Sequence, residues 1–155
     1  MTGKIDARLA ELGITLPEVT TAIGNYVPWV LSGPLVFVSG QLSLKDGKPQ
    51  FVGKLGQEFS TEDGQRAARA CALNLIAQLR NACAGDLDRV ARIVKLGGFV
   101  NCTPEFTEHP QVINGASDLF GEIFGEAGRH ARAAVGCASL PLGEAVEVDG
   151  IFELA

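Results

Sequence analysis

Apolar residues recur at helical spacing in three segments of the chain. In residues 4–12 they fall every three or four positions until Gly13, a pattern typical of a short amphipathic helix. A long helix is predicted to begin at Thr61, and a third helix to span residues 109–124 with a proline in its first turn. The stripe that predicts a buried face on the long helix consists of Ala68, Cys71, Ala72, Leu75, Ile76, Leu79, Ala82 and Cys83.

Runs rich in β-forming residues occupy the rest of the chain. Residues 26–32 and 35–42 are separated by a Gly-Pro pair, which predicts a hairpin. Residues 91–103 give a third strand, in which Gly97 and Gly98 are expected to mark a bulge. The C-terminal segment supplies two further strands.

The order of elements, β, β, helix, β, helix, β, β, shows no internal repeat. Paired strands with two intervening helices predict an α+β layer, a sheet with both helices on one face. We expect residues 1–19 to form an N-terminal helical extension and residues 20–155 to form a single domain. The other face of the sheet is then uncovered, which favours an oligomer.

The last two strands carry charges at positions that are otherwise small or apolar. Arg132 opens the first strand, and Glu147 and Asp149 interrupt the second. A hairpin turned by residues 140–143 is expected to bring Arg132 and Glu147 onto the same, uncovered face. Taken alone, the residues favour a structural ion pair over a functional one by about two to one.

Composition narrows the possible partners. The chain has 155 residues, a net charge of −5 and only 20% charged residues, with no basic cluster. This charge opposes phosphate binding, so nucleic acid is not an expected partner. The N-terminus lacks an apolar core of signal-peptide length, and no run approaches the roughly 18 apolar residues that cross a bilayer. We therefore expect a cytoplasmic protein with no membrane partner.

Familiar catalytic and cofactor motifs are not found in the sequence. The four cysteines have no CxxC pair and no histidines at ligand spacing, and they are interpreted as apolar core residues rather than metal ligands. His109 is expected at a helix start and His130 in a surface loop, neither in a triad motif. Tyr26 and Trp29 could line a pocket, although aromatic residues in strands more often only pack.

Several short motifs, in order and in spacing, make residues 20–154 similar to the RidA (YjgF/L-PSP) family. SGQ and the combination of an arginine, LP and VEV are specific together, although each alone is weak. The matching stretches are AIGNY at 22–26, VFVSGQL at 36–42, Asn114 within QVINGASDLF, HAR at 130–132 and LPLGEAVEVDGIF at 140–152.

The resemblance implies a chorismate-mutase-like α+β fold, assembled as a homotrimer with ligand clefts between subunits and with no metal or organic cofactor. It also implies hydrolysis of reactive 2-imino or enamine acids, such as 2-iminopropanoate and 2-iminobutanoate, to 2-oxo acids and ammonia. A binding protein that holds a 2-oxo acid without turnover is the alternative. An endoribonuclease is a further one, disfavoured by the acidic charge.

By matched position, Arg132 is expected to clamp the substrate carboxylate, and Glu147 to hold and polarise the attacking water. A guanidinium can meet a carboxylate with two parallel hydrogen bonds, and a buried carboxyl can exchange protons with water and amine. Further pocket positions implied by the resemblance are Tyr26, Ser39, Gly40 and Asn114.

The chain departs from the family pattern at four places, of which Asp149, one carbon shorter than the usual glutamate, is expected to be structural. Ala134 stands where many members have cysteine, so no thiol chemistry is expected there. Asn25 and His130 each replace a proline that is common in the family. Together with Trp29 nearby, these changes bear on the substrate side chain rather than on the type of reaction.

Overall fold

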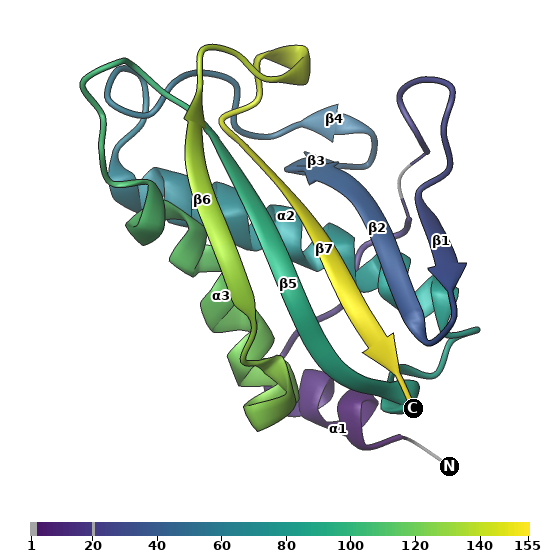
Figure 1. Cartoon of the computed structure of the whole chain (residues 1–155). Helices are drawn as coiled ribbons and strands as arrows, with labels where there is room; N and C mark the ends of the chain where they lie inside the picture. Colours follow the sequence, from purple (N-terminus) through teal and green to yellow (C-terminus); the bar gives the residue numbers. More distant parts are fainter. Residues whose placement is uncertain (1–2, 20) are drawn as a thin grey trace.

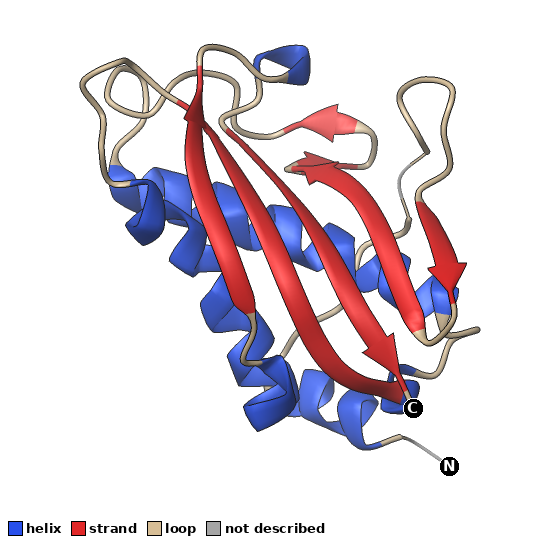
Figure 2. Ribbon diagram, in the orientation of Figure 1, coloured by secondary structure: helices blue, strands red, loops and turns tan. Residues whose placement is uncertain are grey.

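The structure is a computed structural model that describes residues 3–19 and 21–155. Its main element is a five-stranded sheet in the order β1-β2-β7-β5-β6, and the helices lie together on one face of it (Figure 1; Figure 2). This arrangement confirms the predicted α+β class with helices on one side. The domain boundary expected at residue 20 falls on a position outside the described residues.

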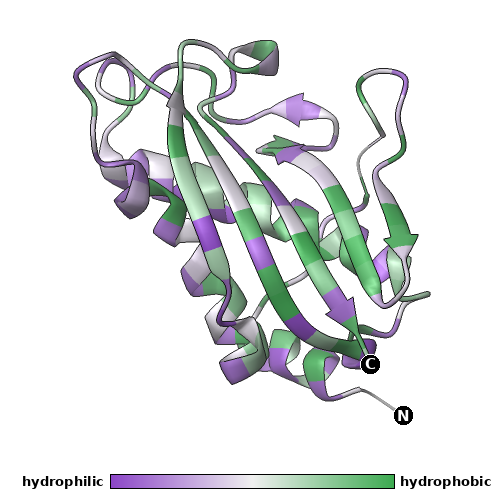
Figure 3. Cartoon of the chain, viewed as in Figure 1, coloured by the Kyte–Doolittle hydropathy of each residue, from purple (hydrophilic) through white to green (hydrophobic). Residues whose placement is uncertain are grey.

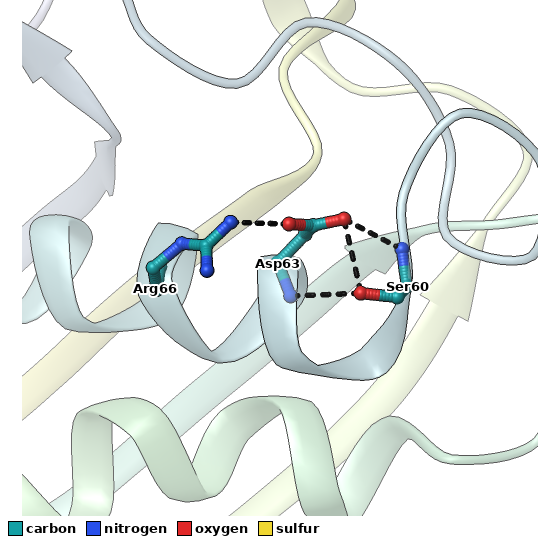
Figure 4. Close-up of polar contacts among 3 residues, drawn as sticks. All are labelled: Ser60, Asp63 and Arg66. Carbon is teal, nitrogen blue, oxygen red and sulfur yellow. Dashed lines mark hydrogen bonds and ion pairs between the residues drawn. The ribbon is translucent and has the colours of Figure 1, made fainter.

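The predicted helices form where apolar periodicity and capping residues coincide. Ser60 and Asp63 make a reciprocal capping box at the start of the long helix, and Arg66 forms an ion pair with Asp63 (Figure 4). No helix in the described part of the chain has the length and apolarity needed to span a bilayer. The helices are α1 (Lys4–Glu11), α2 (Thr61–Ala82) and α3 (His109–Phe124), with short 3₁₀ turns η1 (Leu87–Arg89), η2 (Gly125–Gly128) and η3 (Pro141–Gly143).

The strands alternate between a face buried under the helices and a face that is open. Along β7 every second residue from Val146 is buried, and Glu147 and Asp149 fall on the open side. The strands of the sheet are β1 (Trp29–Ser32), β2 (Leu35–Leu42), β5 (Val90–Asn101), β6 (Ala131–Cys137) and β7 (Val146–Leu154). A separate two-stranded ribbon consists of β3 (Leu44–Lys45) and β4 (Lys48–Pro49).

The predicted C-terminal hairpin is wrong. β6 pairs with β5, in parallel, and β7 pairs antiparallel with β2 and β5, so that β5 lies between the two charged strands (Figure 1). Arg132 also lies on the face that α3 covers, since it bonds to that helix. The small side chains beside it make room for α3, because a Cβ on Gly136 would lie 2.6 Å from Nε2 of His109.

The glycine pair in β5 does not form the expected bulge. The register of β5 against β7 shifts earlier, between Val90 and Arg92 and again between Ile93 and Lys95. Gly97 and Gly98 instead pair regularly and give space on opposite faces. A Cβ on Gly97 would overlap the Asp149 carboxylate on the open face, and one on Gly98 would overlap Ile113 of α3.

The N-terminal helix is fastened to the rest of the molecule. The Asp88 carboxylate, in η1, accepts the backbone N–H groups of Lys4 and Ile5 at 2.8 Å each. These bonds satisfy free donors at the start of α1 and lower the pKa of Asp88. Leu9 is buried in the main core cluster, so α1 shares the core that lies under the sheet.

The open face of the sheet exposes apolar side chains. Phe37 is 39% exposed, since its neighbours Val36 and Val38 point under the helices. Val30, which pairs with Phe37, is 48% exposed, and Val135 on β6 is 47% exposed. In Figure 3 the strands of the sheet are mostly green or pale, the colours of hydrophobic and intermediate residues. A face of this kind is typical of a surface buried between protein subunits.

Two glycines of α3 give a matched test of helix packing. A Cβ on Gly115 would overlap the backbone carbonyl of Gln65 in α2, whereas a Cβ on Gly121 meets nothing within 4 Å. Gly115→Ala is therefore expected to destabilise the protein by about 1–3 kcal/mol through overpacking. Gly121→Ala is expected to stabilise it by up to about 1 kcal/mol through helix propensity. Thermal unfolding at one protein concentration measures both; equal effects of the two variants would contradict the described α2–α3 contact.

Candidate functional site

A small cleft lies between the segment 21–28, the end of β2 and the start of β7. Its free volume is about 70 Å³. Three of the residues expected in the site, Tyr26, Gly40 and Glu147, line it together. The complete lining is Thr21, Ala22, Ile23, Tyr26, Pro28, Gly40, Gln41, Leu42, Leu44, Pro141 and Glu147.

Ser39 holds one wall of the cleft in place. Its backbone N–H donates to the carbonyl of Pro28 and its hydroxyl to that of Val27, both at 2.8 Å. The Tyr26 hydroxyl accepts the backbone N–H of Ile23 at 3.2 Å, which closes a turn within the same segment. Ser39 thus supports the cleft through the backbone that carries Tyr26.

Gly40 provides the space for the Glu147 carboxyl. The pairing of β2 with β7 shifts register between Val38 and Gln41, so Gly40 lies in an irregular part of the strand. A Cβ at this position would lie 2.9 Å from Oε1 of Glu147. A side chain at position 40 would therefore displace the carboxyl, which explains why a glycine occupies the strand there.

The Glu147 carboxyl is suited to proton exchange. It is half-buried, and this burial, followed by the negative charge of Asp149, raises its pKa above the ordinary value of 4.5. Within residues 3–19 and 21–155 no hydrogen bond or ion pair is found for it. A carboxyl held this way can accept a proton from water and return it to a leaving group.

Glu147→Gln is expected to stabilise the protein at pH 8, and this gain should disappear toward pH 4. The folded-state pKa of Glu147 is raised, so folding favours the protonated acid, and ionisation lowers the free energy of unfolding as the pH rises from about 4.5 through the folded value. Glutamine avoids that loss because it does not ionise. Denaturant unfolding of both proteins from pH 4 to pH 8 measures the difference; a gain that is independent of pH would contradict it.

Arg132 is held by α3 and not by an acid. Its Nη1 donates to Oδ1 of Asn114 at 2.8 Å and to Oγ of Ser117 at 3.1 Å, and its Nη2 donates to the carbonyl of Pro110 at 3.3 Å. Among the described residues no carboxylate forms an ion pair with it. The structural Arg132–Glu147 pair that the residues alone favoured is therefore wrong.

The bonds of Arg132 leave one edge of its guanidinium available. Arginine has five N–H donors, and the three bonds to α3 use both hydrogens of Nη1 and one of Nη2. Among the described residues, the N–H of Nε and the second N–H of Nη2 are not assigned to an acceptor. In a guanidinium, Nε and Nη2 share one edge, and an edge of this kind binds a carboxylate with two parallel hydrogen bonds.

One chain does not bring the expected acid and cation together. Glu147 lies in the cleft on the open face, and Arg132 lies two strands away at the β6 edge, on the helix face. Trp29 and Ala134 are not part of the lining of the Glu147 cleft, and both pack against the core. Within one chain the acidic and the basic group of the expected site therefore lie apart.

Two contacts near Arg132 were not predicted from the sequence: its bond to Ser117, and the bond of Ser117 to His130. Ser117 follows Asn114 by one helical turn, so the period of α3 places both on the side that faces Arg132. His130, expected in a surface loop, is instead partly buried and lies 2.9 Å from the Ser117 hydroxyl. His109 does begin α3, as expected. No group of three or more potential metal-ligating side chains occurs in the described part of the chain.

Fold and site together define an α+β protein whose sheet has one helix-covered face and one open face with a small acidic cleft. Residues 6–154 match the family described as "YjgF/chorismate mutase-like, putative endoribonuclease". The Trypanosoma cruzi protein TCP17 is 52% identical over 153 residues, which cover 98% of this chain and 95% of that protein.

Solved structures agree with this match. The protein Atu1372 of Agrobacterium tumefaciens, of unknown function, is 50% identical, with a TM-score of 0.91 over 97% of this chain and 92% of its own. A Shewanella oneidensis protein described as a "putative endoribonuclease" is 41% identical, with a TM-score of 0.94 over 98% of this chain and 100% of its own. The chain belongs to the YjgF/RidA family, and its fold is the chorismate-mutase-like fold.

Proposed function

We propose that the protein hydrolyses reactive 2-imino and enamine acids to 2-oxo acids and ammonia, in clefts between the subunits of a homotrimer. The observation that carries this proposal is the division of the site into two halves. The cleft has a half-buried carboxyl with a raised pKa, and the β6 edge has a guanidinium with two adjacent N–H groups that no described residue uses. Hydrolysis of a 2-imino acid needs both groups: a cation that binds its carboxylate and a carboxyl that transfers protons at the imine.

In the proposed reaction, Arg132 binds the substrate carboxylate and so fixes the position of the imine carbon. Glu147, from the adjacent subunit, accepts a proton from a water molecule as its oxygen bonds to that carbon. The protonated Glu147 then donates to the nitrogen of the tetrahedral adduct. As the C–N bond breaks, the hydroxyl of the adduct passes its proton through Glu147 to the departing nitrogen, so that ammonia leaves and the carbonyl of the 2-oxo acid forms. An enamine enters the same path after tautomerising to the imine.

A second copy of this chain is the occupant we propose for the open face. The exposed apolar residues there, among them Val30, Phe37 and Val135, are of the kind that subunit contacts bury. Such contacts also provide a way for the Glu147 cleft of one chain to meet the Arg132 edge of the next. This arrangement would explain why a single chain keeps the two groups apart.

Mixing two impaired variants, at a substrate concentration below the wild-type KM, tests the proposal. Arg132→Ala and Glu147→Gln are each expected to lose most activity toward 2-iminobutanoate. Refolded together in equal amounts, they should regain about one quarter of the wild-type rate, because one cleft in four combines an intact arginine with an intact glutamate. The rate of imine loss, with wild type mixed with each variant as the control, measures this. If the mixture regained no activity, the proposal that two subunits share a cleft would be refuted.

Binding without turnover is the second candidate, since the free guanidinium edge suits any small carboxylate. In that case the protein would bind 2-oxobutanoate, and wild type would not accelerate imine loss. The endoribonuclease description attached to the family is a third. It is less favoured, because the net charge is −5 and the site has the single cation Arg132. RNA cleavage abolished by Arg132→Ala would reverse this order.

A further inference from the structure

Arg132 is the first member of a chain of hydrogen bonds that runs into the protein. Its Nη1 contacts the Ser117 hydroxyl at 3.1 Å, and that hydroxyl lies 2.9 Å from Nε2 of His130. Nδ1 of His130 lies 2.6 Å from the carbonyl oxygen of Gly128. The chain therefore joins β6, α3 and η2 at one point behind the guanidinium.

The direction of every bond in this chain is determined by chemistry. The carbonyl of Gly128 can only accept, so Nδ1 of His130 carries the hydrogen. In a neutral imidazole Nε2 is then an acceptor, and the Ser117 hydroxyl must donate to it. The hydroxyl oxygen is left to accept from Arg132, which has only donors. All three groups are satisfied in one arrangement.

The surroundings of His130 agree with a neutral ring. The ring of Phe120 contacts it edge-on, at a centroid distance of 6.2 Å. Burial lowers the pKa of His130, and the charge of Arg132 lowers it further. Its polar contacts within the described residues are the Ser117 hydroxyl and the Gly128 carbonyl. A protonated ring would present an N–H to Ser117 and place a second positive charge beside Arg132.

We propose that Ser117 and His130 are positioning residues: they hold both hydrogens of Arg132 Nη1 toward α3, together with Asn114, so that the Nε/Nη2 edge faces the substrate carboxylate. The proposal rests on the function proposed for Arg132. Without this chain of bonds the guanidinium could rotate about its last side-chain bonds, and part of its binding energy would be spent on ordering it. The expected consequence is a loss in substrate binding rather than in the chemical step.

Three variants separate this role from simple packing. Ser117→Ala removes the hydroxyl that accepts from Arg132. His130→Asn can still donate to Gly128 from its amide nitrogen but cannot reach Ser117. His130→Gln offers an acceptor near the position of Nε2. We expect Ser117→Ala and His130→Asn to raise KM for 2-iminobutanoate about tenfold, with kcat within about twofold of wild type, and His130→Gln to restore most of the loss.

Ser32→Ala is a matched control, because Ser32 is exposed at the end of β1; its KM should equal that of wild type. Thermal unfolding of each variant checks that the fold persists. KM values for Ser117→Ala and His130→Asn that match wild type would overturn the proposal. Equal losses in His130→Gln and His130→Asn would also overturn it, because a merely structural histidine gives that result.

Nitrogen-15 NMR tests the same proposal without substrate. At pH 7 the ring of His130 should carry its hydrogen on Nδ1, and a hydrogen on Nε2 would contradict the direction of the chain. The Nε–H of Arg132 should be ordered in wild type and more mobile in Ser117→Ala; unchanged mobility would refute the positioning role. If wild type hydrolyses no imine, the proposed function fails, while this measurement still decides whether Ser117 orders Arg132.

Discussion

Replacing Arg132 by alanine is expected to lower kcat/KM for freshly generated 2-iminobutanoate about tenfold to a few hundredfold, equivalent to about 1.5–3 kcal/mol. The change removes the two adjacent N–H groups proposed to bind the carboxylate, and nothing among the described residues replaces them. Most of the loss should occur as a higher KM. Direct binding of 2-oxobutanoate should weaken by a similar factor.

Arg129 provides the matched control for this variant. It is three residues earlier and is largely exposed, and its ion pair within the described residues is the i,i+3 pair with Glu126 at 4.0 Å. Arg129→Ala should leave kcat/KM unchanged, since exposed pairs contribute little. If Arg132→Ala hydrolysed 2-iminobutanoate at the wild-type rate while keeping its fold, the carboxylate clamp would have to be abandoned.

Glu147→Gln is expected to lower kcat about 100-fold or more with a smaller effect on KM, because glutamine cannot accept a proton from water. The amide has nearly the same shape, so it should fit the space beside Gly40. Single-turnover rates of imine loss measure the chemical step directly. Retention of more than about half of the wild-type kcat would exclude Glu147 as the proton acceptor.

Two other acids on the open face of β7 provide one control variant and one test of the raised pKa of Glu147. Glu153→Gln removes an acid of the same strand face outside the cleft, and kcat should not change. Asp149→Asn removes the charge that helps to raise the pKa of Glu147. It should therefore move the acid limb of the kcat profile to lower pH, because Glu147 then ionises more easily. A limb that stays in place would mean that another group controls the rate.

Sequence periodicity predicted the elements well but not how the last two strands pair. Alternation correctly places Arg132 with Ala134 and Gly136 on one face of β6. It is a local property, however, and cannot tell which strand lies alongside. The connection between β6 and β7 crosses the end of β5 instead of turning back, and it is fastened there, because the backbone N–H of Asn101 donates to the carbonyl of Ala145 at 2.8 Å.

The candidate site was predictable only in part for the same reason. Small residues share the face of β6 that carries Arg132, and in the structure they accommodate α3, a partner that strand alternation does not reveal. The grouping of Tyr26, Gly40 and Glu147 was predicted from their matched positions in the family. In the structure these three residues line one cleft. Predicting the Ser117–His130 contact would need the angle at which α3 crosses β6. The spacing of residues along the chain does not determine that angle.

The position of β7 in the sheet has a consequence for biosynthesis. β7 lies between β2 and β5, yet it follows every other strand of the sheet along the chain. Until residues 146–154 emerge from the ribosome, the β1–β2 hairpin and the β5–β6 pair each present an unpaired edge toward the missing strand. Such edges invite pairing with other nascent chains. Stop codons or stalls shortly before Val146 should therefore yield two half-sheets that aggregate, rather than a smaller folded protein.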